Sequence, residues 1–184
     1  MRKNAFTLIE IMVAVGIFAI LLTTFTGFFV GAVQSQRKTL ASQELIDNVS
    51  YNLEYMSRTI RMARKDLVGD CISIKNNYET NPERNRIKFL NYQGECQEFF
   101  WNDNDNRLYE LKNGETALPL TPANLEIVSF VLSGSESWGQ DQEPLTQPKV
   151  TLFLEIKGKG QKPELQPLIK IQTTISQRNL NVQY

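Results

Sequence analysis

Apolar and polar residues divide the chain of 184 residues into three zones. No charged residue occurs from Ile11 to Val33, and a helix over that run would be about 34 Å long at about 1.5 Å of rise per residue. This length is enough to cross the hydrocarbon core of a bilayer. The first zone therefore predicts one membrane-spanning helix.

Beyond the apolar run, the hydrophobic residues keep a helical period. They recur at alternating steps of three and four, at Ile46, Val49, Leu53, Met56, Ile60, Ala63 and Leu67. This spacing predicts one apolar face, and Gly69 predicts the end of the helix. We expect a continuous helix from Phe6 to Leu67, with a transmembrane half at 6–33 and an amphipathic exported half at 34–68. The apolar face would pack on the chain's own sheet, and coiled-coil pairing with another chain is the alternative.

Residues 69–184 change to short alternating or aromatic-rich runs separated by turn signals. The predicted strands are 71–75, 86–92, 96–101, 107–111, 125–132, 150–157 and 168–177. Short connections between consecutive strands predict an antiparallel meander. One sheet face would be buried against the helix through Ile87, Phe89, Phe99, Trp101, Val128, Phe130 and Leu152. The expected fold class is α+β, a long N-terminal helix packed on an antiparallel β-sheet.

Composition narrows the chemistry of this chain. Twenty Lys and Arg balance twenty Asp and Glu, so the net charge makes no case for nucleic acid. Histidine, the commonest general base and transition-metal ligand, is absent. No grouping of Ser, Lys or carboxylates has the spacing of a catalytic site, so we predict no enzyme activity and no cofactor. Residues 103–106, Asp-Asn-Asp-Asn, lack the glycine and distal glutamate of an EF-hand, so we expect a plain turn and no metal site.

One carboxylate, Glu10, stands at the start of the apolar run. A charged side chain in a membrane helix costs about 2.5 to 3.5 kcal/mol on insertion scales, so it needs a partner. The run is too long for a cleaved secretory signal, and a plain signal-anchor helix is the alternative. The basic pair Arg2-Lys3, the segment Ala5-Phe6-Thr7-Leu8-Ile9-Glu10 and the apolar run together resemble the N-terminal signal of type IV pilins and type II secretion pseudopilins.

The resemblance implies how Glu10 finds its partner. A prepilin peptidase would remove residues 1–5 as a leader by cutting between Ala5 and Phe6, and would methylate the new N-terminus. Glu10 would then meet the N-terminal amine of a neighbouring subunit in the filament. The family usually has glycine before the cut, but Ala5 is also small, so we expect processing. Cleavage frees an amine that is largely protonated at neutral pH, and this amine supplies the charge opposite to Glu10.

Function and location follow from this resemblance and from charge. Two basic residues, Arg2 and Lys3, precede the span, so we expect a single-pass protein of the inner or cytoplasmic membrane with a periplasmic or extracellular C-terminal domain.

The leading hypothesis is a structural minor subunit of a type IV pilus or type II secretion pseudopilus. Its partners would be other pilin subunits, the prepilin peptidase, the membrane and the assembly machinery. The alternative is an anchored receptor or adhesin that does not polymerise. A DNA-uptake minor pilin ranks third, because the basic helix end lacks interleaved aromatic residues.

Three features of the exported part are candidate contacts or links. Cys71 and Cys96 would lie outside the cytoplasm, where a disulfide can form, and two buried thiols are the alternative. Trp138 lies in a long polar loop. The basic cluster Arg58, Arg61 and Arg64 is either a solvated face or a contact with a partner. In a filament, this basic end would face the acidic stretch of a staggered neighbour, and a charge reversal at Asp47 and Arg61 would test that arrangement.

Overall fold

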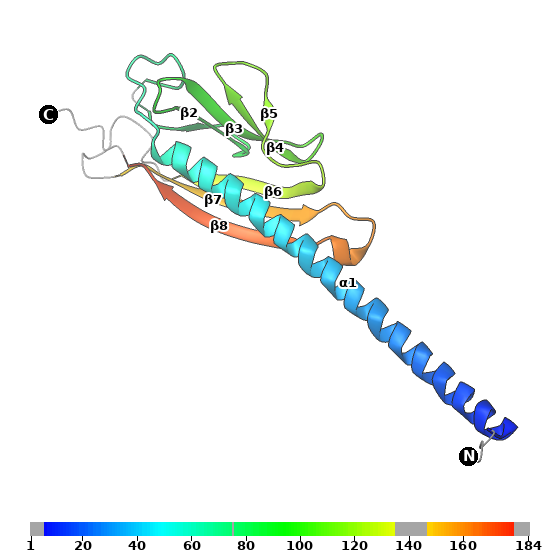
Figure 1. Ribbon diagram of the computed structural model, residues 1–184. Helices are drawn as coiled ribbons and strands as arrows, with labels where there is room; N and C mark the ends of the chain where they lie inside the picture. The colour runs from blue at the N-terminus through cyan, green and yellow to red at the C-terminus, as the bar shows by residue number, and fades with distance from the viewer. Residues whose placement is uncertain (1–5, 75, 135–146, 179–184) are drawn as a thin grey trace. The chain divides into compact units, whose positions relative to one another are not determined.

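The computed structural model describes residues 6–74, 76–134 and 147–178. The chain divides into two compact units, Met1–Leu40 and Ala41–Tyr184. One helix, α1, covers Leu8–Arg61. It forms the described secondary structure of the first unit and the N-terminal element of the second (Figure 1).

The second unit contains two antiparallel sheets. The first has the order β1-β2-β3-β4-β5, with strands Glu79–Thr80, Arg86–Leu90, Cys96–Asn102, Arg107–Lys112 and Leu118–Pro119. The second has the order β6-β7-β8, with strands Leu125–Gly134, Lys149–Gly158 and Leu168–Ser176. A short 3-10 helix, η1, covers Pro163–Leu165. Strands that follow one another in the chain pair within each sheet, so the α+β class and the antiparallel pairing are confirmed, whereas the prediction of one sheet is wrong.

Proline explains why the first sheet stops at β5. Pro119 pairs with Tyr109 of β4 and has no N–H to offer to a further strand. The chain then turns through residues 120–124, and β6 begins beside the first sheet. There the Ile127 N–H donates to the Asn106 carbonyl at 2.8 Å. The meander therefore continues as a second sheet.

Helix α1 and both sheets share one hydrophobic core within the second unit. The helix contributes Leu45, Val49, Met56 and Ile60. The strands contribute residues such as Ile87, Phe89, Phe99, Leu108, Phe130 and Leu152. Figure 1 shows the cyan C-terminal part of α1 running along the sheets. Burial of each large apolar side chain stabilises the fold by about 1.5 to 3 kcal/mol, so this core holds the helix in place.

The buried face of α1 differs from the predicted face at its two ends. Ile46 is 49% exposed, and its neighbour Leu45 is fully buried instead. Asn52 is also buried, although its position was not part of the predicted apolar series. Leu67 is 60% exposed because the helix ends at Arg61. The middle of the predicted face is confirmed.

The early end of α1 has a tertiary cause. The Arg178 N–H donates to the Arg61 carbonyl at 2.7 Å, and the Gln177 Nε2 donates to the Ala63 carbonyl at 2.7 Å. The Gln177 Oε1 in turn accepts a bond from the Asn77 Nδ2 at 2.9 Å. These bonds occupy carbonyl groups that a longer helix would use itself. The C-terminal end of β8 therefore closes the helix.

The predicted strand over residues 71–75 is wrong. Residues 71–74 form bends and a turn. The Asp66 carboxylate accepts the N–H groups of Cys71 and Ile72 at 2.9 and 3.1 Å, and these groups are thereby lost to a sheet. The other predicted strands agree with β2, β3, β4, β6, β7 and β8 within two residues at each end.

Val128 was predicted to be buried, but it is 41% exposed. A β-bulge between Ile127 and Ser129 shifts the pairing of β6 with β7 by one residue. The shift reverses the alternation of side chains, so Ile127 and Phe130 both reach the core. Strict alternation along this strand could not reveal the extra residue.

Candidate functional site

The N-terminal end of α1 carries the residues that the sequence singles out. Thr7 precedes the helix, and the Glu10 N–H donates to the Thr7 Oγ1 at 3.4 Å. Glu10 is therefore the third residue of the helix, at the spacing of a capping box. Phe6 is 77% exposed, and Ala5 lies outside the described residues. No ion pair joins Glu10 to another residue in the described part of the chain.

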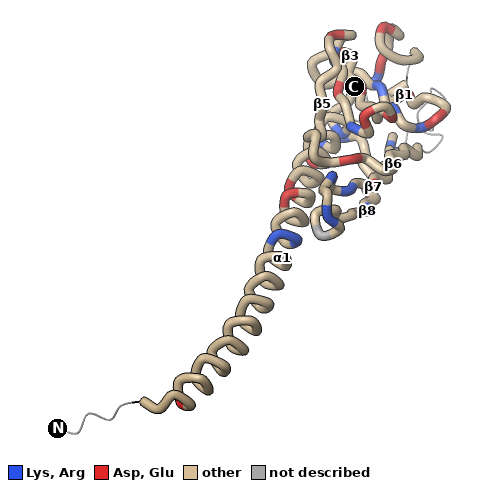
Figure 2. The backbone as a smooth tube through the Cα atoms, turned by 90° about the vertical axis from the view of Figure 1, so that its right-hand side faces the viewer, with Lys and Arg blue, Asp and Glu red and all other residues tan. Residues whose placement is uncertain are grey.

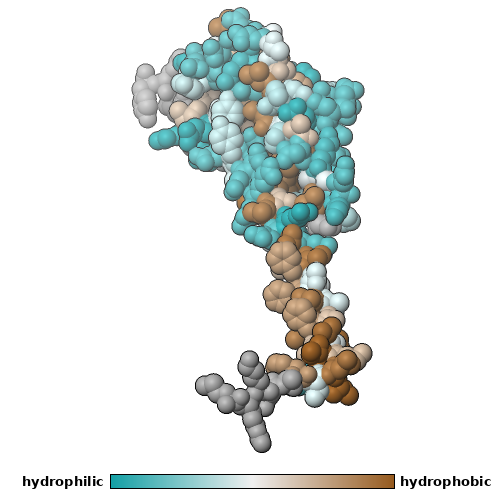
Figure 3. All heavy atoms as spheres, turned by 45° about the vertical axis from the view of Figure 1, so that its right-hand side comes forward, coloured by the Kyte–Doolittle hydropathy of each residue, from teal (hydrophilic) through white to brown (hydrophobic). Residues whose placement is uncertain are grey.

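The helix that follows Glu10 is apolar on all sides. Figure 2 shows one acidic position near its N-terminal end and no further charge until the basic pair Arg37 and Lys38. The large apolar side chains of this stretch are exposed, as the brown surface in Figure 3 illustrates. Thr23 and Thr24 donate their hydroxyls to the Ile20 carbonyl at 2.9 and 2.7 Å. The hydroxyls are thus satisfied within the helix, as an apolar surrounding requires.

Residues 1–26 match a family model described as the prokaryotic N-terminal methylation motif. The chain carries this methylation motif. The motif is characteristic of type IV pilins and pseudopilins, so the resemblance found in the sequence is confirmed. No curated protein and no solved structure matches the chain. The methylation motif and the long apolar helix fit a membrane-anchored protein with a single span.

Two of the three arginines of the predicted basic cluster at the other end of α1, Arg58 and Arg61, line one surface hollow. Arg58 forms an exposed ion pair with Glu54 at 3.0 Å. Arg61 lies beside Arg178, which follows β8, and Arg178 lines the same hollow. Arg64 is absent from the lining of that hollow, and its N–H donates to the Leu90 carbonyl at the end of β2. The sequence could not predict that Arg178 joins this cluster.

Cys71 and Cys96 are joined by a disulfide that ties the loop after α1 to the start of β3. The same loop is held by Asp66, which is 2% exposed. The carboxylate of Asp66 accepts bonds from four backbone N–H groups, of Val68, Gly69, Cys71 and Ile72. Burial alone would raise the pKa of Asp66, but the four bonds outweigh it and lower the pKa to about 2. Trp138 lies outside the described residues.

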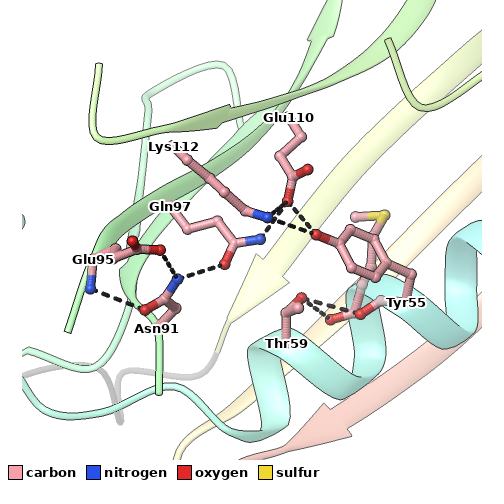
Figure 4. A network of polar contacts seen from close by, with 8 residues as sticks. Tyr55, Thr59, Asn91, Glu95, Gln97, Glu110 and Lys112 are labelled. Carbon is pink, nitrogen blue, oxygen red and sulfur yellow. Dashed lines mark hydrogen bonds and ion pairs between the residues drawn. The ribbon is translucent and has the colours of Figure 1, made fainter. Parts of the chain in front are cut away.

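A partly buried polar network joins α1 to the first sheet (Figure 4). The Tyr55 hydroxyl and the Gln97 Nε2 both donate to the Glu110 Oε1, and Lys112 Nζ lies 3.3 Å from the same oxygen. Burial and the bond to Glu110 raise the pKa of Tyr55. Burial would lower the pKa of Lys112, but its contacts with Tyr55 and Glu110 raise it. Tyr55 therefore remains a protonated donor, and the network acts as a helix-to-sheet tie.

The outer face of the first sheet holds an aromatic ladder that bears on nucleic-acid binding. Phe100 and Tyr109 stack with their ring centroids 5.7 Å apart. The guanidinium carbon of Arg86 lies 5.0 Å from the centre of the Phe100 ring, and that of Arg107 lies 5.9 Å from the Tyr109 centre. Stacking of bases requires free ring faces, and here guanidinium groups and the rings themselves cover them. The ladder gives no support to a DNA-binding role.

The described residues give no evidence for a metal site. They contain no cluster of three or more histidine, cysteine, aspartate or glutamate residues that could hold a metal ion. Residues 103–106 form the turn between β3 and β4, as predicted. Within that turn, Asp105 accepts a bond from the Tyr109 hydroxyl.

Proposed function

We propose that this chain is a minor structural subunit of a type IV pilus or of a type II secretion pseudopilus. A prepilin peptidase cleaves it between Ala5 and Phe6 and methylates Phe6. The mature chain then leaves the membrane and joins a filament of related subunits. The methylation motif over residues 1–26 is the observation that carries this proposal.

The charge of Glu10 gives the proposal its physical basis. The carboxylate starts an apolar helix whose side chains are exposed, and the described residues contain no ion-pair partner for it. An unpaired charge of this kind costs about 2.5 to 3.5 kcal/mol in a membrane. The amine of a processed Phe6 on a neighbouring subunit compensates this cost. Glu10 therefore drives the helix toward another processed subunit.

We further propose that residues 41–184 lie in the periplasm or outside the cell. The two basic residues before the apolar run favour a cytoplasmic N-terminus. The disulfide between Cys71 and Cys96 supports the same orientation, because such bonds persist in oxidising compartments. A structural role, without catalysis, agrees with the motif.

The N-terminal residue of the mature protein tests this proposal. The full chain is expressed with and without an active prepilin peptidase, and the N-terminal peptide is analysed by mass spectrometry. We expect Phe6 with one added methyl group when the peptidase is present. An intact Met1 beside a correctly processed control pilin would overturn the proposal and favour the anchored receptor or adhesin.

Two substitutions at Glu10 separate assembly from helix capping. Glu10→Gln keeps a side chain suited to the capping box but removes the charge, whereas Glu10→Ala removes both. We expect both variants to be cleaved normally and to be lost from the sheared filament fraction. Normal incorporation of Glu10→Gln would mean that only the cap matters at this position.

A further inference from the structure

A surface hollow of about 310 Å³ lies beside the C-terminal end of α1. It is lined by Glu54, Ser57, Arg58, Arg61, Met62 and Arg178. The Arg178 N–H donates to the Arg61 carbonyl at 2.7 Å, so the backbones that carry these two arginines are tied together. The hollow is therefore built by the helix end and the end of β8 in common.

The hollow carries excess positive charge. Three arginines and one glutamate line it, so its net charge is three minus one, or +2. Glu54 is already paired with Arg58 at 3.0 Å. No ion pair is formed by Arg61 or Arg178 with any other residue that the structure describes. Two guanidinium groups, each able to bind a carboxylate with two parallel hydrogen bonds, are available to an anion.

An exposed carboxylate lies farther toward the N-terminus on the same helix. Asp47 forms no ion pair with the residues described, whereas Glu44, one turn away, accepts a bond from the Asn124 Nδ2 at 2.7 Å. Asp47 precedes Arg61 by 14 residues, which is about 21 Å along a helix and about 40° around it. Tyr51, between them on the same side, is 72% exposed. One side of the helix, a ridge that we follow from Asp47 to Arg61, thus carries an unpaired carboxylate at one end and an unpaired guanidinium group at the other.

We infer that this hollow receives the Asp47 carboxylate of a second copy of the same chain. The two ends of the ridge cannot meet within one chain, because a straight helix holds them apart. Between two copies they are complementary. If the copies stand parallel, as chains with their N-terminal helices in one membrane would, the contact is head to tail, and each copy keeps a free acid and a free hollow for the next. A head-to-tail contact extends into an open filament when the rotation between copies does not close a ring, and in this respect the inference rests on the proposed function.

Cross-linking without a spacer tests the contact directly. Arg61→Lys keeps the positive charge and introduces an amine that a carbodiimide can join to a carboxylate in an ion pair. The full chain carrying Arg61→Lys is treated in membranes, and the linked peptides are identified by mass spectrometry. We expect a linkage between positions 47 and 61 and a ladder of multimers on a denaturing gel. Asp47→Asn in the same background is the matched control, and it should abolish the linkage at position 47, because a carbodiimide does not activate an amide.

A charge reversal provides an independent readout. Asp47→Arg alone and Arg61→Asp alone should each weaken self-association in low salt, and the double variant should restore it. Raising the salt concentration from 0.05 to 0.5 M should weaken the wild-type contact, because both groups are exposed. Thermal unfolding of each variant shows whether the fold is intact.

The outcomes separate this inference from the proposed function. Correct processing to Phe6 without any 47–61 linkage would overturn the inference and leave the function in place. A 47–61 linkage in a chain that keeps Met1 would support the inference and overturn the function. A linkage from position 61 to another protein, or no recovery in the double reversal, would show that the hollow receives a different occupant.

Discussion

Replacing Asp66 by asparagine should destabilise the second unit of this protein by about 3 kcal/mol at neutral pH. In the native chain each carboxylate oxygen accepts two backbone N–H groups, at distances of 2.7 to 3.1 Å. An asparagine offers one oxygen, and its amide group would face two of these N–H groups as a competing donor. Leaving a buried donor without a partner costs about 1 to 3 kcal/mol for each group.

The pKa of Asp66 gives a second measure of the same interaction. Its ordinary value of 3.8 falls to about 2 in the folded chain, which corresponds to about 2 kcal/mol of stability. Because the folded pKa is the lower one, this stability is present above the unfolded pKa. It is lost as the pH falls from about 4 to about 2. The wild type should therefore lose stability in this window, and Asp66→Asn should lose about 2 kcal/mol less than the wild type.

Urea unfolding of the full chain in detergent, followed by tryptophan fluorescence, measures both effects. Titrations at pH 7, 4 and 2 cover the window. Asp70→Asn is the matched control, since Asp70 lies in the same loop but is exposed, and it should change the free energy of unfolding by less than about 0.5 kcal/mol. An Asp66→Asn variant as stable as this control, or with the pH dependence of the wild type, would refute the reasoning.

Three other contacts predict measurable changes in the same assay. Replacing Cys71 and Cys96 by serine should cost about 3 kcal/mol, because the disulfide closes a separation of 25 residues, and a reducing agent should abolish the difference. Gln177→Leu should cost about 2 kcal/mol, since buried hydrogen-bonding groups on two other segments lose their partner. A stability equal to the wild type would contradict that role. Tyr55→Phe should cost about 1 kcal/mol, and a neutral result would mean that Glu110 is satisfied without the hydroxyl.

Periodicity predicted the helix and most strands because each depends on neighbouring residues. It placed the middle of the buried helix face correctly, at Val49, Met56 and Ile60. It failed at Val128, where one additional residue in a bulge reverses the side-chain alternation. It also failed to find the tie between Tyr55 and Glu110, because residues 55 positions apart leave no local pattern.

The candidate sites also differ in how far the sequence alone could reveal them. The methylation motif is contiguous, so the sequence alone could identify it, together with Glu10 and the apolar run. The sequence indicated only part of the hollow at the helix end, namely the basic cluster that includes Arg58 and Arg61. Its partner Arg178 lies more than a hundred residues beyond Arg61, and only the fold brings them together.

The sequence by itself determined the long apolar helix, the methylation motif and the α+β class of this protein, because these follow from local spacing and hydrophobicity. The tertiary structure decided where α1 ends, how the strands divide into two sheets and which arginines share a hollow. Those features depend on hydrogen bonds between distant segments, such as that from Arg178 to Arg61. Such bonds compete with local preferences for the same carbonyl and N–H groups, and the outcome is set only when the chain has folded.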